Sequence, residues 1–150
     1  RQAARDLPPM SRGVTLPELL LALVVVGLLS LIALPKLAAV TSANALRHEA
    51  TQLVAALDAA RTAAIRVGAP STLTLSDSSY TVIGGLPGDS VRAWRIPGPG
   101  TRGVQLTGAG GPIHFGASGL AIGVANRTLT LTRGGSSRRV VLSRLGRITP

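Results

Sequence analysis

The chain has 150 residues and a formal net charge of +10, with no Cys, 18 Gly and aromatic residues at only 2%. This length allows one domain and one accessory segment, and the lack of Cys excludes a disulfide framework and a thiolate metal site. With few aromatics, a thin core must be built from Leu, Val, Ile and Ala. The charge is uneven, because no acidic residue follows Asp89, whereas nine arginines do: Arg92, Arg95, Arg102, Arg127, Arg133, Arg138, Arg139, Arg144 and Arg147.

The first predicted element is an apolar helix. Residues 19–35 carry no charge, and counted from Val14 the run approaches the roughly 20 residues that cross a bilayer as a helix. The basic residues before it favour a cytoplasmic N-terminus, with the following domain outside the cytoplasm; they are Arg1, Arg5 and Arg12. An alternative is a cleaved secretory signal, since the small residues 42–45 suit signal peptidase and would leave a free secreted β-domain beginning at Leu46. The run exceeds the about 7–15 residues of an ordinary signal core, which favours the membrane span.

One carboxylate, Glu18, lies just inside this apolar run. An ionised acid in hydrocarbon costs about 2.5–3.5 kcal/mol, so the residue needs an interfacial position or a cationic partner. No cation within the span can serve. Glu18 therefore either reaches the headgroups near the start of the helix or pairs with a charge from elsewhere.

The residues around Glu18 carry a family resemblance. The segment RGVTLPEL, residues 12–19, resembles the prepilin signal of type IV pilins and type II secretion pseudopilins. The resemblance implies that a prepilin peptidase cuts between Gly13 and Val14 and that Val14 becomes the N-methylated terminus. It also implies that Glu18 pairs with the terminal amine of a neighbouring subunit during assembly.

The match to the prepilin signal has two departures. Val14 stands where the family usually has Phe, and Pro17 stands where it has Leu or Ile. A Pro in the first helical turn removes an N–H that has no partner there, so the helix tolerates it. Residues 1–13 would form the leader, and Met10 is a candidate true start that would make residues 1–9 an extension of the gene model.

The chain beyond the apolar run continues as an amphipathic helix over residues 36–67. Apolar residues recur there at steps of three and four, which predicts a stripe that packs on a sheet; the stripe is Leu46, Ala50, Leu53, Leu57, Ala60 and Ala64. Charged residues mostly lie off this stripe: Arg47, Glu49, Asp58, Arg61 and Arg66. Gly68 and Pro70 end the helix. One long helix is therefore expected from about Val14 to Val67.

The remaining residues, 68–150, predict a β-rich domain. Short alternating or apolar runs predict strands at residues 71–75, 80–83, 91–96, 104–107 and 113–115. The clearest hairpin spans residues 127–144, with alternation before a Gly134-Gly135 turn. The chain is therefore assigned to the α+β class, as a long N-terminal helix packed on an antiparallel β-rich domain.

Three further segments extend the resemblance. Residues 53–75, 113–119 and 140–148 look like the GspH/FimT group of minor pseudopilins and minor pilins. In that group the helix packs on a β-rich domain that ends with a Gly-Arg motif, here Gly146 and Arg147. The resemblance implies a pilin-like, single-pass protein of the bacterial inner membrane with three parts: a transmembrane helix half (14–35), an amphipathic helix half (36–67) and a periplasmic domain (68–150).

The resemblance implies a structural function, as a minor subunit that helps initiate or cap a periplasmic or surface filament for protein secretion. The implied partners are other pilins or pseudopilins, the prepilin peptidase and the inner membrane. The alternative is a DNA-binding minor pilin for DNA uptake, because some members of the group bind DNA through a C-terminal Gly-Arg-x-Arg motif. Thr149 stands where that motif has its second Arg. The candidate DNA-binding residues are Arg138, Arg139, Arg144, Gly146 and Arg147, and Arg47 on the helix lies outside this set.

Catalysis, cofactors and metals find no support in the sequence. His48 and His114 are far apart and have no Cys or patterned acids to complete a metal set. The Gly-rich segments lack the phosphate-binding P-loop pattern, and no Ser-His-acid arrangement is defensible. Trp94 lies between Arg92 and Arg95, where a base could stack on it, but a core position is favoured in a chain with few aromatics. No enzyme activity and no cofactor are expected.

Overall fold

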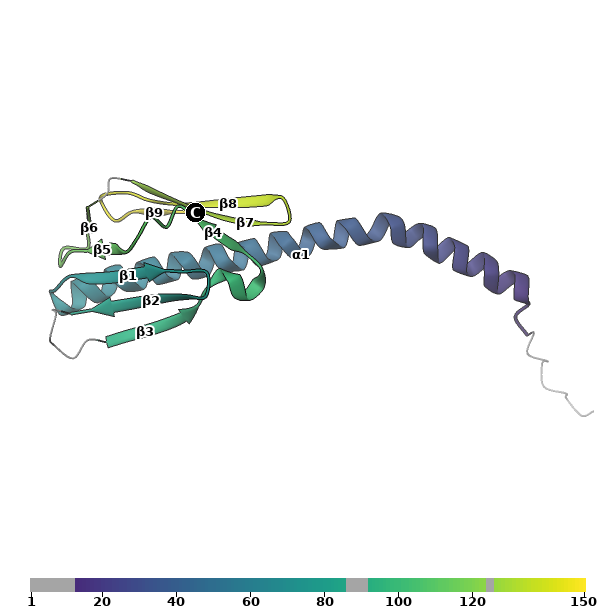
Figure 1. The fold of residues 1–150 in the computed structure, drawn as a ribbon, viewed down its shortest axis with the longest axis horizontal. Helices are drawn as coiled ribbons and strands as arrows, with labels where there is room; N and C mark the ends of the chain where they lie inside the picture. The colour runs from purple at the N-terminus through teal and green to yellow at the C-terminus, as the bar shows by residue number, and fades with distance from the viewer. Residues whose placement is uncertain (1–12, 86–91, 124–125) are drawn as a thin grey trace, which may run out of the picture. The chain divides into compact units, whose positions relative to one another are not determined.

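The computed structural model describes residues 13–85, 92–123 and 126–150 (Figure 1). One long helix is followed by short strands and one 3-10 turn: α1 (Leu16–Val67), β1 (Ser71–Leu75), β2 (Ser79–Gly84), β3 (Arg92–Pro97), η1 (Pro99–Arg102), β4 (Gln105–Thr107), β5 (Ile113–Phe115), β6 (Ala121–Ile122), β7 (Arg127–Arg133), β8 (Ser136–Leu142) and β9 (Ile148–Thr149). The α+β prediction is confirmed. Outside the described residues lie the leader positions Arg1, Arg5, Met10 and Arg12, and Val91 at the edge of a predicted strand.

Local chemistry accounts for both ends of helix α1. Pro17 occupies the first turn, where the N–H that Pro lacks would have had no helical partner. The helix ends at Val67 because Gly68 adopts a φ of +67°, the left-handed conformation that closes many helices. Pro35 lies inside the helix and removes one backbone hydrogen bond there. The chain divides into two compact units, of which the second runs from Ala38 to Pro150.

The first unit carries the apolar half of α1, as far as Leu37. Its large apolar side chains are exposed, from Val14 at 67% to Leu37 at 61%. This part of α1 is long and apolar enough to cross a membrane. Because the described part of the chain covers none of these side chains, the segment requires an apolar environment from lipid or from other helices.

The second unit is built on one face of α1. All six residues of the predicted stripe are buried, with none more than 3% exposed: Leu46, Ala50, Leu53, Leu57, Ala60 and Ala64. Ala56 is buried with them. Because four of these seven side chains are alanines, strands can approach the helix closely. The predicted sheet-packing stripe is confirmed.

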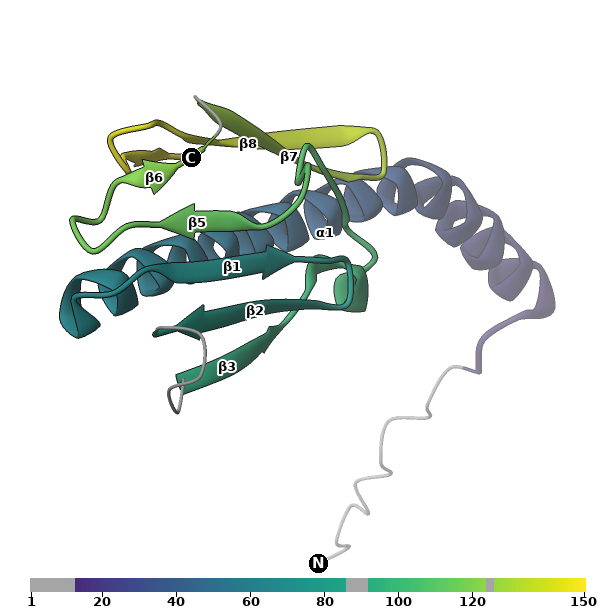
Figure 2. The same ribbon diagram turned by 60° about the vertical axis from the view of Figure 1, so that its left-hand side comes forward.

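Two antiparallel sheets pack against this face of α1 (Figure 2). The strand order is β3-β2-β1-β5-β6 in the first sheet and β4-β7-β8-β9 in the second. Strands β7 and β8 form the predicted hairpin, with Arg133 opposite Ser136. Gly134 and Gly135 have φ values of +56° and +79°, as a two-residue type I′ turn requires.

The core lies between the α1 stripe and the inward faces of both sheets. Alternate strand residues point inward, and the largest of them are Leu73, Tyr80, Val82 and Phe115 from the first sheet and Leu129, Leu131 and Val140 from the second. Trp94 is partly buried against this core, as the sequence favoured. The sequence missed β6, β9 and η1: β6 and β9 have only two residues each, and η1 is a single 3-10 turn, so none of them shows an alternating or helical pattern.

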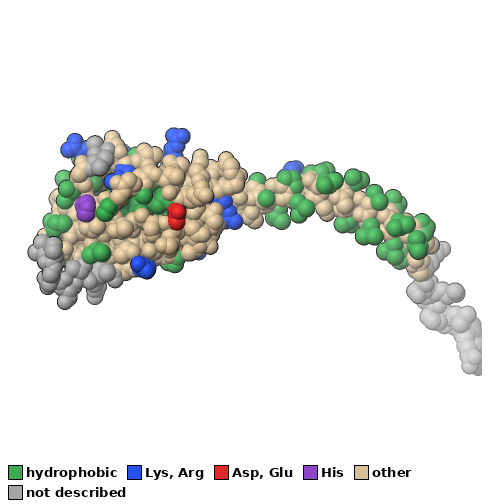
Figure 3. Space-filling model, viewed as in Figure 1, with side chains coloured by type: hydrophobic (Ala, Val, Ile, Leu, Met, Phe, Trp, Pro, Cys, Tyr) green, Lys and Arg blue, Asp and Glu red, His purple; other side chains and the backbone are tan. Residues whose placement is uncertain are grey.

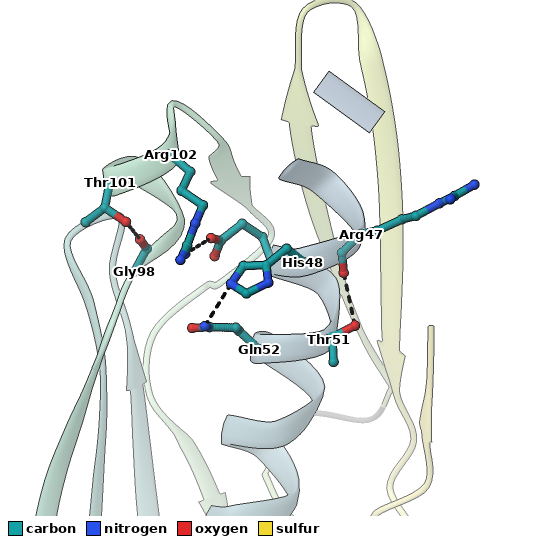
Figure 4. A network of polar contacts seen from close by, with 8 residues as sticks. Arg47, His48, Thr51, Gln52, Gly98, Thr101 and Arg102 are labelled. Atoms are coloured by element: carbon teal, nitrogen blue, oxygen red, sulfur yellow. Dashed lines mark hydrogen bonds and ion pairs between the residues drawn. The ribbon is translucent and has the colours of Figure 1, made fainter. Parts of the chain in front are cut away.

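Glu49 corrects the interpretation of the helix face. Its side chain is fully buried although the spacing placed it off the stripe, and Arg102 Nη1 donates to Glu49 Oε1 at 2.6 Å (Figure 4). Helical spacing could not reveal this pair, since the cation comes from a turn 53 residues away. Turn η1 holds Arg102 in place, because the Gly100 N–H donates to the Asp77 carbonyl oxygen at 2.8 Å.

Tyr80 lies in the core within electrostatic reach of Glu49. Its side chain is fully buried, and its hydroxyl has no hydrogen-bond partner among the described residues. Burial raises the pKa of the Tyr80 phenol, and the carboxylates of Glu49 and Asp77 raise it further. The phenol therefore stays neutral, which spares the core a second negative charge beside Glu49.

Replacing Arg102 by Ala should lower the free energy of unfolding by about 1–3 kcal/mol, because the buried Glu49 carboxylate would lose its cation. Chemical unfolding of the full chain in detergent micelles, followed by circular dichroism, measures this change. Arg95→Ala is the matched control, since Arg95 is exposed on β3 and should change stability by less than about 0.5 kcal/mol. Equal losses for the two variants would contradict the role of the ion pair.

Candidate assembly site and cationic surfaces

The candidate cleavage site lies in an exposed, non-helical segment directly before α1. Gly13, Val14 and Thr15 are all exposed, and the helix begins at Leu16. A Cβ added to Gly13 would meet nothing within 4 Å, and its backbone does not adopt the left-handed region. Packing and backbone conformation therefore do not explain this glycine. A small residue before a peptidase cut, as the prepilin resemblance implies, would explain it.

Glu18 lies in the first turn of α1, at the third helical position. Its Oε2 accepts a hydrogen bond from the Thr15 N–H at 3.4 Å, the reach-back contact of a capping box. Negative charge is also favoured here by the helix dipole. Because the side chain remains exposed, its carboxylate is accessible to a cation from another molecule.

The Gly146-Arg147 motif forms the turn between β8 and β9. Gly146 has a φ of +75°, and a Cβ there would lie 2.5 Å from the Gly119 carbonyl oxygen, so both the backbone and the packing require glycine. Arg61 of α1 donates through Nη1 to the Gly146 carbonyl oxygen at 3.3 Å. This hydrogen bond holds the turn against α1. The spacing of residues along the helix could not predict this role of Arg61, because its partner lies 85 residues away.

The candidate DNA-binding arginines do not lie on one patch. Arg138 and Arg139 are adjacent in β8, so their side chains leave opposite faces of the sheet, and Arg138 shares the face of buried Val140. Arg144 and Arg147 are both exposed on the β8–β9 turn, which brings these two together. Figure 3 shows the Arg side chains scattered over this face of the second unit.

Other arginines hold the fold together. Besides Arg102 and Arg61, Arg127 hydrogen-bonds the backbone: its Nη1 donates to the carbonyl oxygens of Ala109 and Gly111, at 2.6 and 2.7 Å. These hydrogen bonds fix the loop before β5. Part of the positive charge counted in the sequence is therefore structural and does not form a binding surface.

A groove runs between α1 and the edge of the second sheet. Two hollows of about 350 and 330 Å³ form it, and Arg47 and Arg138 line both. We call it the α1–β8 groove and define it by Arg47, Thr51 and Val54 of α1 and Ser136, Ser137 and Arg138 of β8. Arg47, which the sequence placed outside the DNA-binding set, therefore lies beside one of its members.

A further hollow, of about 570 Å³, lies between α1 and the β8–β9 turn. Asp58 and Arg61 line it from the helix, and Leu145 and Arg147 line it from the turn. It differs from the α1–β8 groove in having an acidic side chain, that of Asp58, in its lining. This acidic side chain lowers the positive potential close to Arg147.

The two histidines occupy ordinary exposed positions. The His48 ring lies 3.0 Å from Gln52 Nε2 one turn along α1 (Figure 4), and His114 Nδ1 lies 3.0 Å from Thr72 Oγ1 on the neighbouring strand. Among the residues that the structure describes, no group of three or more His, Cys, Asp or Glu could hold a metal ion.

Comparison with protein families assigns the chain. The family model described as Type II transport protein GspH matches residues 49–146, more than half of the chain. The chain belongs to the GspH family. A second model, described as Prokaryotic N-terminal methylation motif, matches residues 9–34 of this GspH-family protein. The predicted resemblance to prepilin-type subunits of this family is therefore confirmed.

Two crystal structures of the type IV minor pilin FimU from Pseudomonas aeruginosa (strain PAO1) have a similar fold. The first is 22% identical, with a TM-score of 0.58, and the match covers 71% of the GspH-family chain and 87% of the FimU chain. The second is 21% identical, with a TM-score of 0.55, and covers 69% and 90%. A comparison with curated proteins found no match. The pilin-like fold prediction is confirmed.

Replacing Gly146 by Ala should destabilise the protein by about 2–4 kcal/mol, because the methyl group adds a clash with the Gly119 carbonyl to the cost of a positive φ. Thermal unfolding of the full chain in detergent measures the loss. Gly103→Ala is the matched control: its φ is +64° but nothing lies within 4 Å of the added Cβ, so about 1 kcal/mol is expected. A loss at Gly146 no larger than at Gly103 would contradict the packing argument.

Proposed function

We propose that this GspH-family protein is a minor subunit of a type II secretion pseudopilus or a related type IV pilus, where it helps initiate or cap the filament. One observation carries the proposal: a single chain joins a methylation motif over residues 9–34 to an exposed apolar helix and a GspH-type domain. The family is one of structural subunits, so the proposed function requires no catalytic step by this chain.

Processing comes first in this proposal. A prepilin peptidase removes residues 1–13 by cutting between Gly13 and Val14, and Val14 becomes the methylated N-terminus. The exposure of both residues in a non-helical segment supports access by an enzyme. Removal of the leader also takes away basic residues and leaves a single terminal amine before α1.

The proposed topology follows from charge and apolar surface. The basic residues before α1 favour a cytoplasmic N-terminus, and the exposed apolar side chains up to Leu37 favour insertion in the bacterial inner membrane. The second unit then lies in the periplasm. Exposed helices of this kind can leave the lipid without losing apolar contacts when they bundle with the helices of other subunits in a filament.

Glu18 supplies the negative charge for the proposed assembly step. In a single subunit its carboxylate accepts one long hydrogen bond from the Thr15 N–H, which is little compensation for a charge in or near the bilayer. The terminal amine of a neighbouring Val14 supplies the missing cation. The pair forms only between subunits, so the electrostatic cost of Glu18 favours the assembled state over the separate one.

A second function, binding of DNA during uptake, is favoured by the exposure of Arg144 and Arg147 on the turn that Gly146 and Arg61 hold in place. The second unit offers strands and loops at this position, without a recognition helix in the described residues. Contacts would therefore be made to phosphates and would tolerate any sequence.

Replacing Glu18 by Ala should lower incorporation into filaments about tenfold or more, because the amine of the neighbouring subunit loses its counter-ion. Membrane insertion should be unchanged or improved, since a charge leaves the lipid. The measurement is the fraction of protein in sheared filaments, with intact-mass analysis of the N-terminus, in the native host.

Asp58→Ala is the control for Glu18→Ala, since Asp58 is an exposed carboxylate on the second half of α1 and should incorporate normally. The mature chain should begin at methylated Val14 in all variants. Wild-type incorporation of Glu18→Ala would overturn the pairing role. An unprocessed chain, or one that begins at Leu46, would overturn the prepilin assignment.

If DNA is bound at the β8–β9 turn, the double variant Arg144→Ala/Arg147→Ala should weaken binding and reduce the log–log salt slope by about 1.8, from two lost phosphate contacts. Fluorescence anisotropy of labelled duplex with the full chain in micelles, at several salt concentrations, measures both. Arg47→Ala should change little. Absence of saturable binding near physiological salt, or equal losses for Arg47→Ala, would remove the DNA function and leave the filament function intact.

A further inference from the structure

Strand β8 has an open edge inside the α1–β8 groove. It pairs with β7 along its whole length, Ser136–Leu142, whereas β9 pairs only with Val141 and Leu142. On that second side, residues 136–140 have no strand partner among the described residues. The backbone N–H and C=O groups along this edge are therefore free to hydrogen-bond with an added strand.

The groove is lined by two cationic side chains and by no Asp or Glu among the described residues, and Pro150, which follows β9, lines the first hollow beside them. The two cationic side chains are Arg47 and Arg138, which line both hollows. Both arginines are exposed, and the ion pair found in the described chain uses Arg102 instead. A ligand that brings carboxylates would pair with two arginines for which the described residues show no ion pair.

The remaining lining suits an extended peptide. Ala50 and Val54 of α1 present small apolar surface on one side, and Ser136 and Ser137 of β8 present hydroxyl groups on the other. An open strand edge beside a helix face is the geometry of strand addition. In that binding mode the backbone supplies affinity and the flanking side chains supply specificity.

We propose that the α1–β8 groove binds an acidic, extended segment of a neighbouring filament subunit. The segment adds as a strand to residues 136–140 of β8 and pairs its carboxylates with Arg47 and Arg138. This inference rests on the proposed filament function, which supplies the neighbouring subunit. A second copy of this chain is a poor occupant, because it carries 16 Lys and Arg against 6 Asp and Glu.

Duplex DNA matches the groove less well than an acidic peptide does. Its phosphates would satisfy the two arginines but make no use of the unpaired strand backbone. A peptide satisfies both features at once, and the turn that carries Arg144 and Arg147 remains available to phosphates. The α1–β8 groove and the β8–β9 turn are therefore expected to bind different partners. Substitutions in one surface should leave binding at the other unchanged.

The test uses the full chain in detergent micelles and a fluorescein-labelled octapeptide of alternating Thr and Glu as the probe, followed by anisotropy. Saturable binding is expected, and Arg47→Ala/Arg138→Ala should weaken it about tenfold through the loss of two ion pairs. Arg144→Ala/Arg147→Ala is the matched control, with a change below about twofold. Circular dichroism of each variant shows whether it is folded.

Two further probes separate strand addition from charge attraction alone. A Thr-Glu octapeptide that is N-methylated at every backbone amide has the same charge but no backbone N–H donor on either edge, so it should bind about tenfold more weakly. The charge-reversed variant Arg47→Glu/Arg138→Glu should instead prefer a Thr-Lys octapeptide. Both results would support a strand site with charge selectivity.

Several outcomes would overturn the proposal: no saturable peptide binding, equal losses for the two arginine pairs, or equal affinity for the N-methylated peptide. Binding of duplex DNA that depends on Arg47 and Arg138, without peptide binding, would assign the groove to nucleic acid and overturn it too. Failure of the filament function is distinguishable, because it would appear as a wrong N-terminus or normal incorporation of Glu18→Ala.

Discussion

The buried stripe of α1 is the constraint on which the rest of the structure depends. Both sheets bury their inward faces against the same row of helix residues, around Leu53 and Leu57, and the chain has few aromatics to build a core otherwise. Because this row faces the core, it also fixes where the neighbouring residues of α1 lie. On one side Arg47, Thr51, Val54, Asp58 and Arg61 follow at steps of four and three and line the hollows beside the second sheet. Glu49 instead meets Arg102 of η1.

Three features at the surface of the described residues are suited to contact with other molecules. The apolar side chains before Ala38 are exposed, the Glu18 carboxylate has no cation beside it in the described residues, and residues 136–140 of β8 keep an open edge. The apolar side chains cost free energy in water and less when lipid or other helices cover them. The Glu18 carboxylate is costly near hydrocarbon and less so beside a cation, and the open edge of β8 can pair with an added strand. The core of the second unit uses none of the apolar side chains before Ala38.

The positive charge of the second half divides into structural and free arginines. Arg102 compensates a buried carboxylate, Arg127 fixes a loop through two carbonyl oxygens, and Arg61 of α1 holds the β8–β9 turn. Arg138 and Arg147 remain exposed beside two neighbouring hollows, which lie along the same flank of α1 and share Thr51 and Val54. The net charge therefore overestimates how many arginines are available to a ligand. Some of them already bind a carboxylate or carbonyl oxygens of the protein itself.

The sequence by itself determined the elements whose pattern repeats over many residues: the helical stripe from Leu46 to Ala64, the β7–β8 hairpin around its two glycines, and the prepilin motif around Glu18. These patterns are local, so spacing alone reveals them. Only the tertiary structure decided that Glu49 is buried, that Gly146 must be glycine, and that Arg47 lies beside Arg138. In each case the deciding partner is far along the chain: Arg102 is 53 residues from Glu49, Gly119 is 27 from Gly146, and Arg138 is 91 from Arg47. Packing rather than periodicity brings each pair together.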